Sequence, residues 1–481
     1  MTTSDAFSLA TVEAEIKARS GVLRRELALT DLVLAQVLIV MVPEFFGTAV
    51  KAGRSHVVLW CLAIVLFFIP QAFVVSHLNR LMPLEGGLYE WARLAFGDRV
   101  GFLVAWNMWL NVTVQVSQIA LVTTTYISYA FGPRAEWIAS NPRALLAASV
   151  GLIVVMMSVA VLGLKVGKWI SNAGSIFTVL TIGALIVLPY FHVWRGRLTD
   201  YHPLTLVRPP LTLFSLSVFT KMTFGALSGF EYVAIFAGES RNPGRNLARS
   251  ILLTAPIIAL LYILGTSSIL AFVSPDAIDV IGPIPQALSR GFAIFGPARS
   301  LIPLVILLLL MNYVCSYTLY FSANTRLPLV AGWDRLLPQW FTQLHRTYRT
   351  PINSILFMGA IALVASVAVL IGSGNQEAFA LLQVWTWTFY GLAYLAMFAI
   401  PLFARKEKDI RPGKWLRIAA ASGWLVTLLF VLLSVVPIID VQSSWRYSLK
   451  VAAVVLGANF GGWIIYRAGK SQRGRSNDEP S

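Results

Sequence analysis

Apolar runs of about 20 residues recur along the chain and alternate with short polar segments, and a helix of that length crosses roughly 30 Å of hydrocarbon. The first run begins at Leu27 as LALTDLVLAQVLIVMV, and a proline and a carboxylate follow it at once. The pattern predicts an all-α membrane fold with twelve transmembrane helices. These spans are expected near residues 28–50, 56–78, 98–128, 143–163, 169–190, 213–238, 251–273, 300–325, 353–372, 378–402, 414–436 and 447–467.

Composition supports a membrane protein rather than a soluble one. Hydrophobic residues make up 57% of the 481 residues, charged residues make up 12%, and the mean hydropathy is +0.71. In a soluble chain the net charge of +16 would favour a nucleic-acid partner. Most of the 38 Lys and Arg residues lie on one side of the predicted spans, which is the positive-inside pattern. We therefore expect no nucleic-acid partner, a multi-pass protein of the cell (inner or plasma) membrane, and both termini in the cytoplasm.

Loops between the predicted spans are too short to form domains of their own. We expect a cytoplasmic N-terminal segment over 1–27, one twelve-helix domain over 28–467, and a basic cytoplasmic tail over 468–481. The N-terminal segment lacks the apolar core of a cleaved signal peptide. The tail RAGKSQRGR is typical of a segment that faces anionic lipid. Cys61 and Cys315 both fall within spans, so a disulfide scaffold is not expected.

The first span carries a helix breaker and a carboxylate side by side. Pro43 has no N–H to donate to the carbonyl of Ile39, so we expect the helix to kink or open around residues 39–43. Gly47 loosens the next turn. An ordinary proline kink is the alternative. A lone carboxylate in hydrocarbon costs several kcal/mol, so Glu44 is expected to face protein, water or a partner.

The sixth span contains the sequence GALSG. Gly225 and Gly229 lie four residues apart, a spacing that is also typical of a simple helix contact. Ser228 with Glu231 at the third place forms a capping-box pattern, which predicts a helix that starts inside the membrane. An unwound turn before that start would expose backbone groups of Gly225 to Leu227, and these groups bind a charged solute without any side chain.

Interrupted helices at corresponding places in two halves are typical of secondary transporters. Spans 1 and 6 have this relation if the fold is a five-plus-five inverted repeat with spans 11 and 12 added. We therefore predict discontinuous helices 1 and 6 around a solute site. Two alternatives stay open for the Glu44 carboxylate: it caps backbone groups freed by Pro43, or it pairs with Lys221 of span 6, which is expected at a similar depth. Lys221 alone would snorkel to the outer interface.

Two further spans have polar stripes. In span 3, Asn107, Asn111, Gln115 and Gln118 lie on one helical face. In span 8, Asn312, Ser316 and Tyr320 have similar spacing. These faces either line the solute site or form hydrogen bonds between helices without a direct function.

Three stretches identify a family resemblance: MPLEGGLYEWARLAFGDRVGFLVAWNMWL, FGALSGFEYVAIFAGESRNPGRNLARSI and SANTRLPLVAGWDRLLPQWFTQLHRTYRTP. Together they resemble the amino acid/polyamine/organocation superfamily of permeases, from about Arg24 to Lys470. The resemblance implies alternating access around unwound parts of helices 1 and 6 that hold an amino acid backbone. The family's G-x-G motif falls at residues 38–40, where this chain has no glycine, and Glu44 leaves room for amines, polyamines or another cationic solute. Proton-coupled relatives carry a helix 5 lysine, but here only Lys168 lies at that edge, so proton coupling, sodium coupling, exchange and uniport all stay open.

The sequence therefore predicts a secondary-active permease for amino acids or related amines, with a small-molecule solute and the lipid bilayer as its partners. A polytopic membrane enzyme and a non-transporting solute sensor are the alternatives. An enzyme is disfavoured because the five histidines are scattered and form no HExxH motif. No cofactor and no metal site are expected. The predicted solute-binding residues are Ile39, Val40, Pro43, Glu44, Gly225, Ala226, Leu227, Ser228, Gly229, Asn107, Asn111, Asn312 and Ser316, with Lys221, Glu231 and Gly47 as structural or gating residues.

Overall fold

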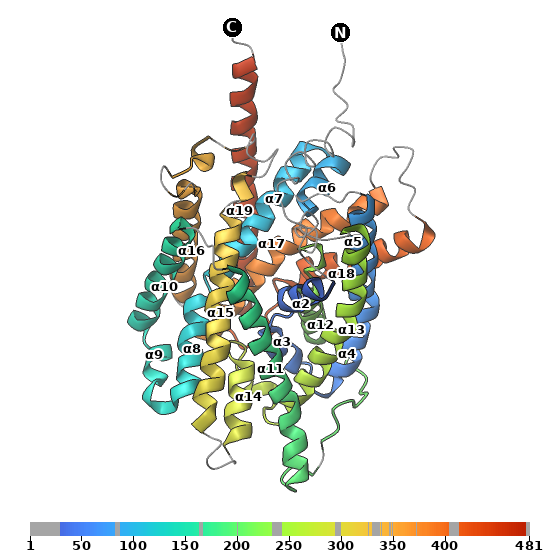
Figure 1. Cartoon of the computed structure of the whole chain (residues 1–481), viewed down its shortest axis with the longest axis vertical. Helices are drawn as coiled ribbons and strands as arrows, with labels where there is room; N and C mark the ends of the chain where they lie inside the picture. The colour runs from blue at the N-terminus through green and yellow to red at the C-terminus, as the bar shows by residue number, and fades with distance from the viewer. Residues whose placement is uncertain are drawn as a thin grey trace.

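A computed structural model describes most of the chain, and the described residues are helical with no strand (Figure 1). The predicted N-terminal segment 1–27 lies outside this part. The described residues are 29–81, 87–162, 167–199, 201–232, 243–293, 300–325, 327–329, 337, 339–345, 348, 350–371, 373–403 and 413–477.

Nine helical stretches in this part of the chain are long and apolar enough to cross a membrane. Their length and composition agree with the multi-pass membrane protein that the sequence predicts. They are Gly53–Leu81, which contains α4 (His56–Ala63) and α5 (Ile69–Leu81), α10 (Pro142–Leu162), α12 (Leu213–Leu227) with its continuation to Tyr232, α13 (Pro243–Leu270), α15 (Ile302–Asn324), α16 (Ile352–Leu370), α17 (Asn375–Phe403), α18 (Lys414–Leu433) and α19 (Ser444–Asn477).

The remaining α-helices are the 28-residue α11 (Gly167–Trp194) and several shorter or interrupted helices. The first predicted span is divided into two helices, and so is the third, between Val116 and Ile119. At this second interruption, the Ser117 carbonyl accepts a hydrogen bond of 2.8 Å from Ser366 of α16, so the freed backbone group has a partner. The α-helices outside the nine long apolar stretches are α2 (Leu29–Val40), α3 (Phe45–Val50), α6 (Gly87–Phe96), α7 (Asp98–Val116), α8 (Ile119–Phe131), α9 (Glu136–Ser140), α11 (Gly167–Trp194) and α14 (Pro283–Phe292).

The short helix α3 and the end of α12 lie at the centre of the bundle. α3 packs against α12 and α13, while α15, α10 and α16 lie on one side of this centre and α13, α5 and α4 on the other (Figure 1). Outer helices instead expose apolar side chains, as α10 does with Leu146, Val150 and Val154 at four-residue spacing. Such a stripe is costly in water and suited to lipid. The fold therefore encloses its irregular backbone and turns regular apolar helices outward.

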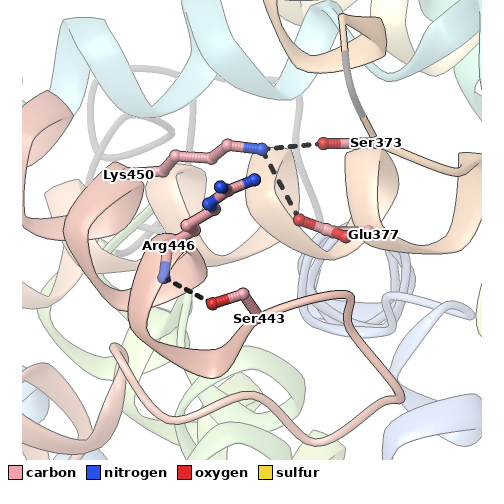
Figure 2. Close-up of polar contacts among 5 residues, drawn as sticks. All are labelled: Ser373, Glu377, Ser443, Arg446 and Lys450. Carbon is pink, nitrogen blue, oxygen red and sulfur yellow. Dashed lines mark hydrogen bonds and ion pairs between the residues drawn. The ribbon is translucent and has the colours of Figure 1, made fainter.

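The long helix α19 is fixed to the bundle by polar contacts at two depths. Near its start, the Lys450 ammonium donates to Ser373 Oγ at 2.9 Å and lies 3.5 Å from a carboxylate oxygen of Glu377 on α17, as Figure 2 shows. Further along, Asn459 Oδ1 accepts a 2.7 Å hydrogen bond from Asn107 of α7. The helix continues to Asn477, past the predicted end of span 12 at residue 467.

Candidate functional site

The first predicted span is broken where the sequence places Pro43 and Glu44. α2 ends at Val40, the next four residues are not helical, and α3 begins at Phe45. The cause is local, because a proline has no N–H and its ring crowds the preceding turn. The prediction of an opened helix is therefore confirmed, although the opening falls at 41–44 rather than at 39–43. Val40 is buried at the end of α2, and the Ile39 side chain lies outside the described residues.

Tyr262 of α13 satisfies the backbone that this break frees. The Val42 N–H donates to Tyr262 Oη at 2.9 Å, and the hydroxyl lies 3.2 Å from Val42 O, to which it donates. The ring is held by Trp60, whose indole stacks on it with a centroid distance of 4.8 Å, and by Phe46 at 5.0 Å. A fully buried tyrosine thus replaces a missing turn of helix.

The sixth predicted span, which we call helix 6, is broken as well, directly after α12. Ser228 is extended (φ −81°, ψ 160°) and Gly229 has φ 122°, a value that favours glycine because a Cβ would be strained there. Residues 230–232 then form a single 3-10 turn, and residues 233–242 lie outside the described part of the chain. Gly225, Ala226 and Leu227 belong to the last turn of α12, so the expectation that they form the unwound turn is wrong.

Two side chains from other helices satisfy the helix 6 break. The Gly229 N–H donates to Tyr394 Oη of α17 at 2.7 Å. The Gln71 amide of α5, turned so that both its polar atoms have partners, donates to Leu227 O at 2.7 Å and accepts from the Phe230 N–H at 3.2 Å. The break is therefore bound from two neighbouring helices.

Glu231 is buried beside this break and faces tyrosines. Its two carboxylate oxygens accept short hydrogen bonds from the hydroxyls of Tyr390 and Tyr394. Ser228 Oγ donates backward to Phe224 O at 2.6 Å, so it closes the helix that ends and does not cap one that begins. The serine half of the predicted capping box is therefore wrong, because the hydroxyl bonds to the free carbonyl of the preceding turn.

The two breaks contact each other through Phe45 and Gly225. A methyl group on Gly225 would overlap the Phe45 ring, and the same ring packs edge-on against Trp387 of α17 at a centroid distance of 5.1 Å. Gly47 is close-packed in turn, since a Cβ there would lie 3.1 Å from Val280 Cα. These two glycines let α3 approach α12 and the segment before α14.

Glu44 is buried in a group of tyrosines. Its Oε1 accepts a 3.0 Å hydrogen bond from Tyr317 of α15, while Oε2 has no partner among the described residues. The rings of Tyr313 and Tyr317 have centroids 5.8 Å apart, and those of Tyr126 and Tyr313 are 5.4 Å apart. We call Glu44 with Tyr126, Tyr313 and Tyr317 the tyrosine cage.

Lys221 does not join this cage. Its ammonium donates to Ser217 Oγ at 3.1 Å and, through a short hydrogen bond, to Val436 O after the end of α18. Carbonyls at the end of a helix are unsatisfied and carry partial negative charge, so they attract a cation. The predicted pair of Glu44 and Lys221 is therefore not formed, because each group has found a different partner.

The polar stripe of span 3 mainly joins helices. Asn111 Nδ2 donates to Thr386 O of α17 at 2.9 Å, and Gln118 Nε2 lies 3.3 Å from the Thr386 hydroxyl. Asn107 bonds to α19 through Asn459. These contacts agree with the alternative of interhelical hydrogen bonding, and neither asparagine has a contact with the tyrosine cage.

On α15, the buried polar face differs from the stripe of Asn312 and Ser316 that the sequence analysis selected. Asn312 and Ser316 are half-buried and lie 3.5 Å apart through Oδ1 and Oγ. Tyr313 and Tyr317, one position further along, are buried and face Glu44. Sequence reasoning missed Tyr262, Tyr394, Tyr313 and Tyr317. The four-residue spacing of the last two was the available signal.

A cavity of about 570 Å³ lies next to the cage, lined by the C-terminal end of α8 and by Ser289 of α14. Asp279 and Glu136 belong to its lining, and no Lys or Arg of the described residues does. Asp279 holds this region together: it accepts from Tyr129 Oη at 2.9 Å, from Gln376 Nε2 at 2.5 Å and from the Ile281 N–H at 2.9 Å. We call it the outer cavity.

Known proteins with similar sequences are transporters. A family model described as amino acid permease matches residues 27–458. An uncharacterised transporter of Legionella pneumophila is 28% identical over 395 residues, 81% of this chain and 83% of its own. From Lactococcus lactis, a probable agmatine/putrescine antiporter is 22% identical (84% of each chain), and an aspartate/glutamate permease is 22% identical (83% and 86%). The chain therefore belongs to the amino acid permease family, and it is a multi-pass membrane transporter of a small-molecule solute rather than an enzyme.

Proposed function

We propose that this transporter moves an amino acid or a related amine by alternating access, with the solute bound between the breaks of helices 1 and 6. The observation that carries the proposal is the pair of breaks itself: α2 stops at Val40, α12 stops at Leu227, and Phe45 joins the two. A membrane tolerates irregular backbone only inside protein or beside a water-filled cavity. Two such segments in contact at the centre of a bundle therefore suit a solute site.

The proposed architecture has twelve crossings. The pairs α2–α3 and α7–α8, together with α11, supply three crossings beside the nine long apolar stretches. Helices 1–5 and 6–10 form two inverted repeats in this proposal, and the corresponding positions of the breaks in helices 1 and 6 support it. The bias of Lys and Arg along the sequence supports a cell-membrane orientation with both termini cytoplasmic.

The relatives' names leave the charge of the solute open. One is named for agmatine and putrescine, which are cations, and another for aspartate and glutamate, which are anionic. At this level the proposal covers both amino acids and amines.

The test is uptake by the full chain reconstituted in liposomes, with a panel of labelled amino acids and amines. Gly225→Leu is expected to reduce uptake at least about tenfold, because the new side chain must displace Phe45 from the contact between the breaks, and overpacking costs about 1–3 kcal/mol. Gly151→Leu on α10 is the matched control, since a Cβ there meets no atom within 4 Å. Uptake of no solute by the wild type, or full uptake by Gly225→Leu, would contradict the proposal.

A further inference from the structure

We infer that the tyrosine cage binds the ammonium group of the solute, and that the carrier selects amines over the α-amino acids from which they derive. This inference rests on the proposed function, and it names the charge that the site recognises. Glu44 supplies the carboxylate, and Tyr126, Tyr313 and Tyr317 supply ring faces and hydroxyls.

The first argument is that the Glu44 carboxylate is only half satisfied. The side chain is buried, with 4% of its surface exposed, and its donors are neutral: the Tyr317 hydroxyl at 3.0 Å from Oε1 and the residue's own backbone N–H. Oε2 has no donor among the described residues. An ionised carboxylate inside the membrane costs several kcal/mol unless a cation or further donors compensate it. An ammonium group offers both a positive charge and three N–H donors.

None of the described residues supplies that cation. No Lys or Arg of the described residues pairs with Glu44. Lys221, which the sequence analysis considered as a partner of Glu44, donates instead to Ser217 and to the carbonyl of Val436. A solute that carries an ammonium group would therefore supply the charge that the described residues lack at Glu44.

The tyrosines around Glu44 suit an ammonium group in a second way. The electron-rich face of an aromatic ring attracts a cation within about 6 Å of its centroid. The ring centroids of Tyr126 and Tyr313 are 5.4 Å apart, and those of Tyr313 and Tyr317 are 5.8 Å apart. A carboxylate among several aromatic rings favours an organic cation over an anion.

The helix 1 break has no amides left to receive an α-carboxylate. Val42 N–H is bound to Tyr262, Pro43 has no N–H, and Phe45 N–H donates to Val42 O at 3.1 Å. The amides of Phe46 and Gly47 donate to the carbonyls of Pro43 and Glu44. The remaining one, on Glu44, lies beside that residue's own carboxylate. A substrate carboxylate here would face a like charge and no donor.

In the described part of the helix 6 break, two amides are bound in the same way. Gly229 N–H is bound to Tyr394, and Phe230 N–H to Gln71. Both breaks therefore satisfy their own backbone, and Glu44 is left as the group that recognises the solute.

The charge of the outer cavity agrees with a cationic solute. Among the described residues, the lining contains the carboxylates of Asp279 and Glu136 and no Lys or Arg, although Arg290 lies near Tyr129 of the lining. An excess of carboxylates raises the local concentration of cations. Tyr129, which lines the cavity, lies one helical turn from Tyr126 of the cage on α8. The cavity and the cage thus meet along one helix.

The experiment compares each amino acid with the amine that remains when its carboxylate is removed: lysine with cadaverine, ornithine with putrescine, leucine with isoamylamine. Binding to the purified full chain is measured by ligand-induced thermal shift, and flux is measured in liposomes. We expect at least one amine to bind at least about tenfold more tightly than its parent amino acid, a difference of about 1.4 kcal/mol. Glutamate is expected not to bind.

Glu44→Gln is expected to reduce amine affinity at least about tenfold, because the ammonium group then loses its buried countercharge. Glu44→Asp keeps the charge and is expected to retain part of the preference for amines. The matched control is Glu377→Gln, the same carboxylate-to-amide change in the α17–α19 ion pair, which is expected to leave the amine preference unchanged. If Glu44→Gln fails to fold, Glu44→Asp and the wild-type preference still decide the question.

The outcomes separate the two proposals. Parent amino acids that bind as tightly as their amines, or an amine preference that survives Glu44→Gln, overturn the inference, and their uptake leaves the permease function standing. An amine preference that depends on Glu44 but occurs without flux supports the inference and overturns the transport proposal. Neither binding nor flux for any pair overturns both.

Discussion

The breaks in helices 1 and 6 differ in how completely the protein satisfies them. At helix 6, Gln71 and Tyr394 bind the free backbone groups, and two tyrosine hydroxyls occupy both oxygens of Glu231. At helix 1, Tyr262 binds the backbone, but one oxygen of Glu44 has no partner among the described residues. Both segments contain an irregular backbone next to a buried carboxylate, and only one carboxylate is fully bonded.

This difference indicates that the two breaks have different roles. A fully bonded network in a low-dielectric interior is rigid, because each lost hydrogen bond exposes a polar group to hydrocarbon. The helix 6 break is therefore suited to be a fixed frame. At the helix 1 break, one oxygen of Glu44 is left for a further donor, which is why the proposed solute site is placed there.

Among the variants that test this difference between the breaks, Tyr394→Phe is expected to have the largest effect on stability. The hydroxyl that this change removes serves both the Gly229 N–H and the Glu231 carboxylate. Leaving both groups buried without it is expected to lower the free energy of unfolding by about 2–4 kcal/mol, since an unsatisfied buried group costs about 1–3 kcal/mol. Thermal unfolding in detergent measures the change. The control is Tyr190→Phe on α11, where the ring is half exposed and packs on Tyr201.

Tyr262→Phe tests the backbone of the helix 1 break and is expected to have a smaller effect. It leaves the Val42 N–H without its acceptor but removes no contact to a carboxylate, so the free energy of unfolding should fall by about 1–2 kcal/mol. The stacking on Trp60 is retained by phenylalanine. Thermal unfolding and uptake are measured together. A loss of stability larger than that of Tyr394→Phe would contradict the conclusion that the helix 6 break is the more rigid of the two.

Lys450→Met is a reference variant far from both breaks, and its effects on stability and uptake are expected to be small. The Lys450 side chain is 37% exposed, and exposed ion pairs contribute only about 0–1 kcal/mol. We expect a shift in stability below about 1 kcal/mol and uptake close to that of the wild type, with the small difference shrinking further as salt concentration rises. A large loss of uptake would mean that the attachment of α19 to α17, drawn in Figure 2, controls transport.

Much of the site was local enough to be predicted. Pro43 and Gly229 act on their own turns, so the existence of both breaks follows from residue type and from their position within apolar runs. The prediction of their limits was less accurate. Gly225 to Leu227 stay helical because nothing in their own backbone prevents it, and the conformation changes only at Gly229.

The sequence by itself determined that the chain crosses a membrane many times and that two crossings are interrupted, because run length, proline and glycine act within a few residues. Only the tertiary structure decided which group compensates each buried charge. Lys221 and Glu44 lie at similar expected depths, yet one binds the end of α18 and the other faces tyrosines of α15. Such partners come from residues more than 200 positions away, and their distances depend on how whole helices pack.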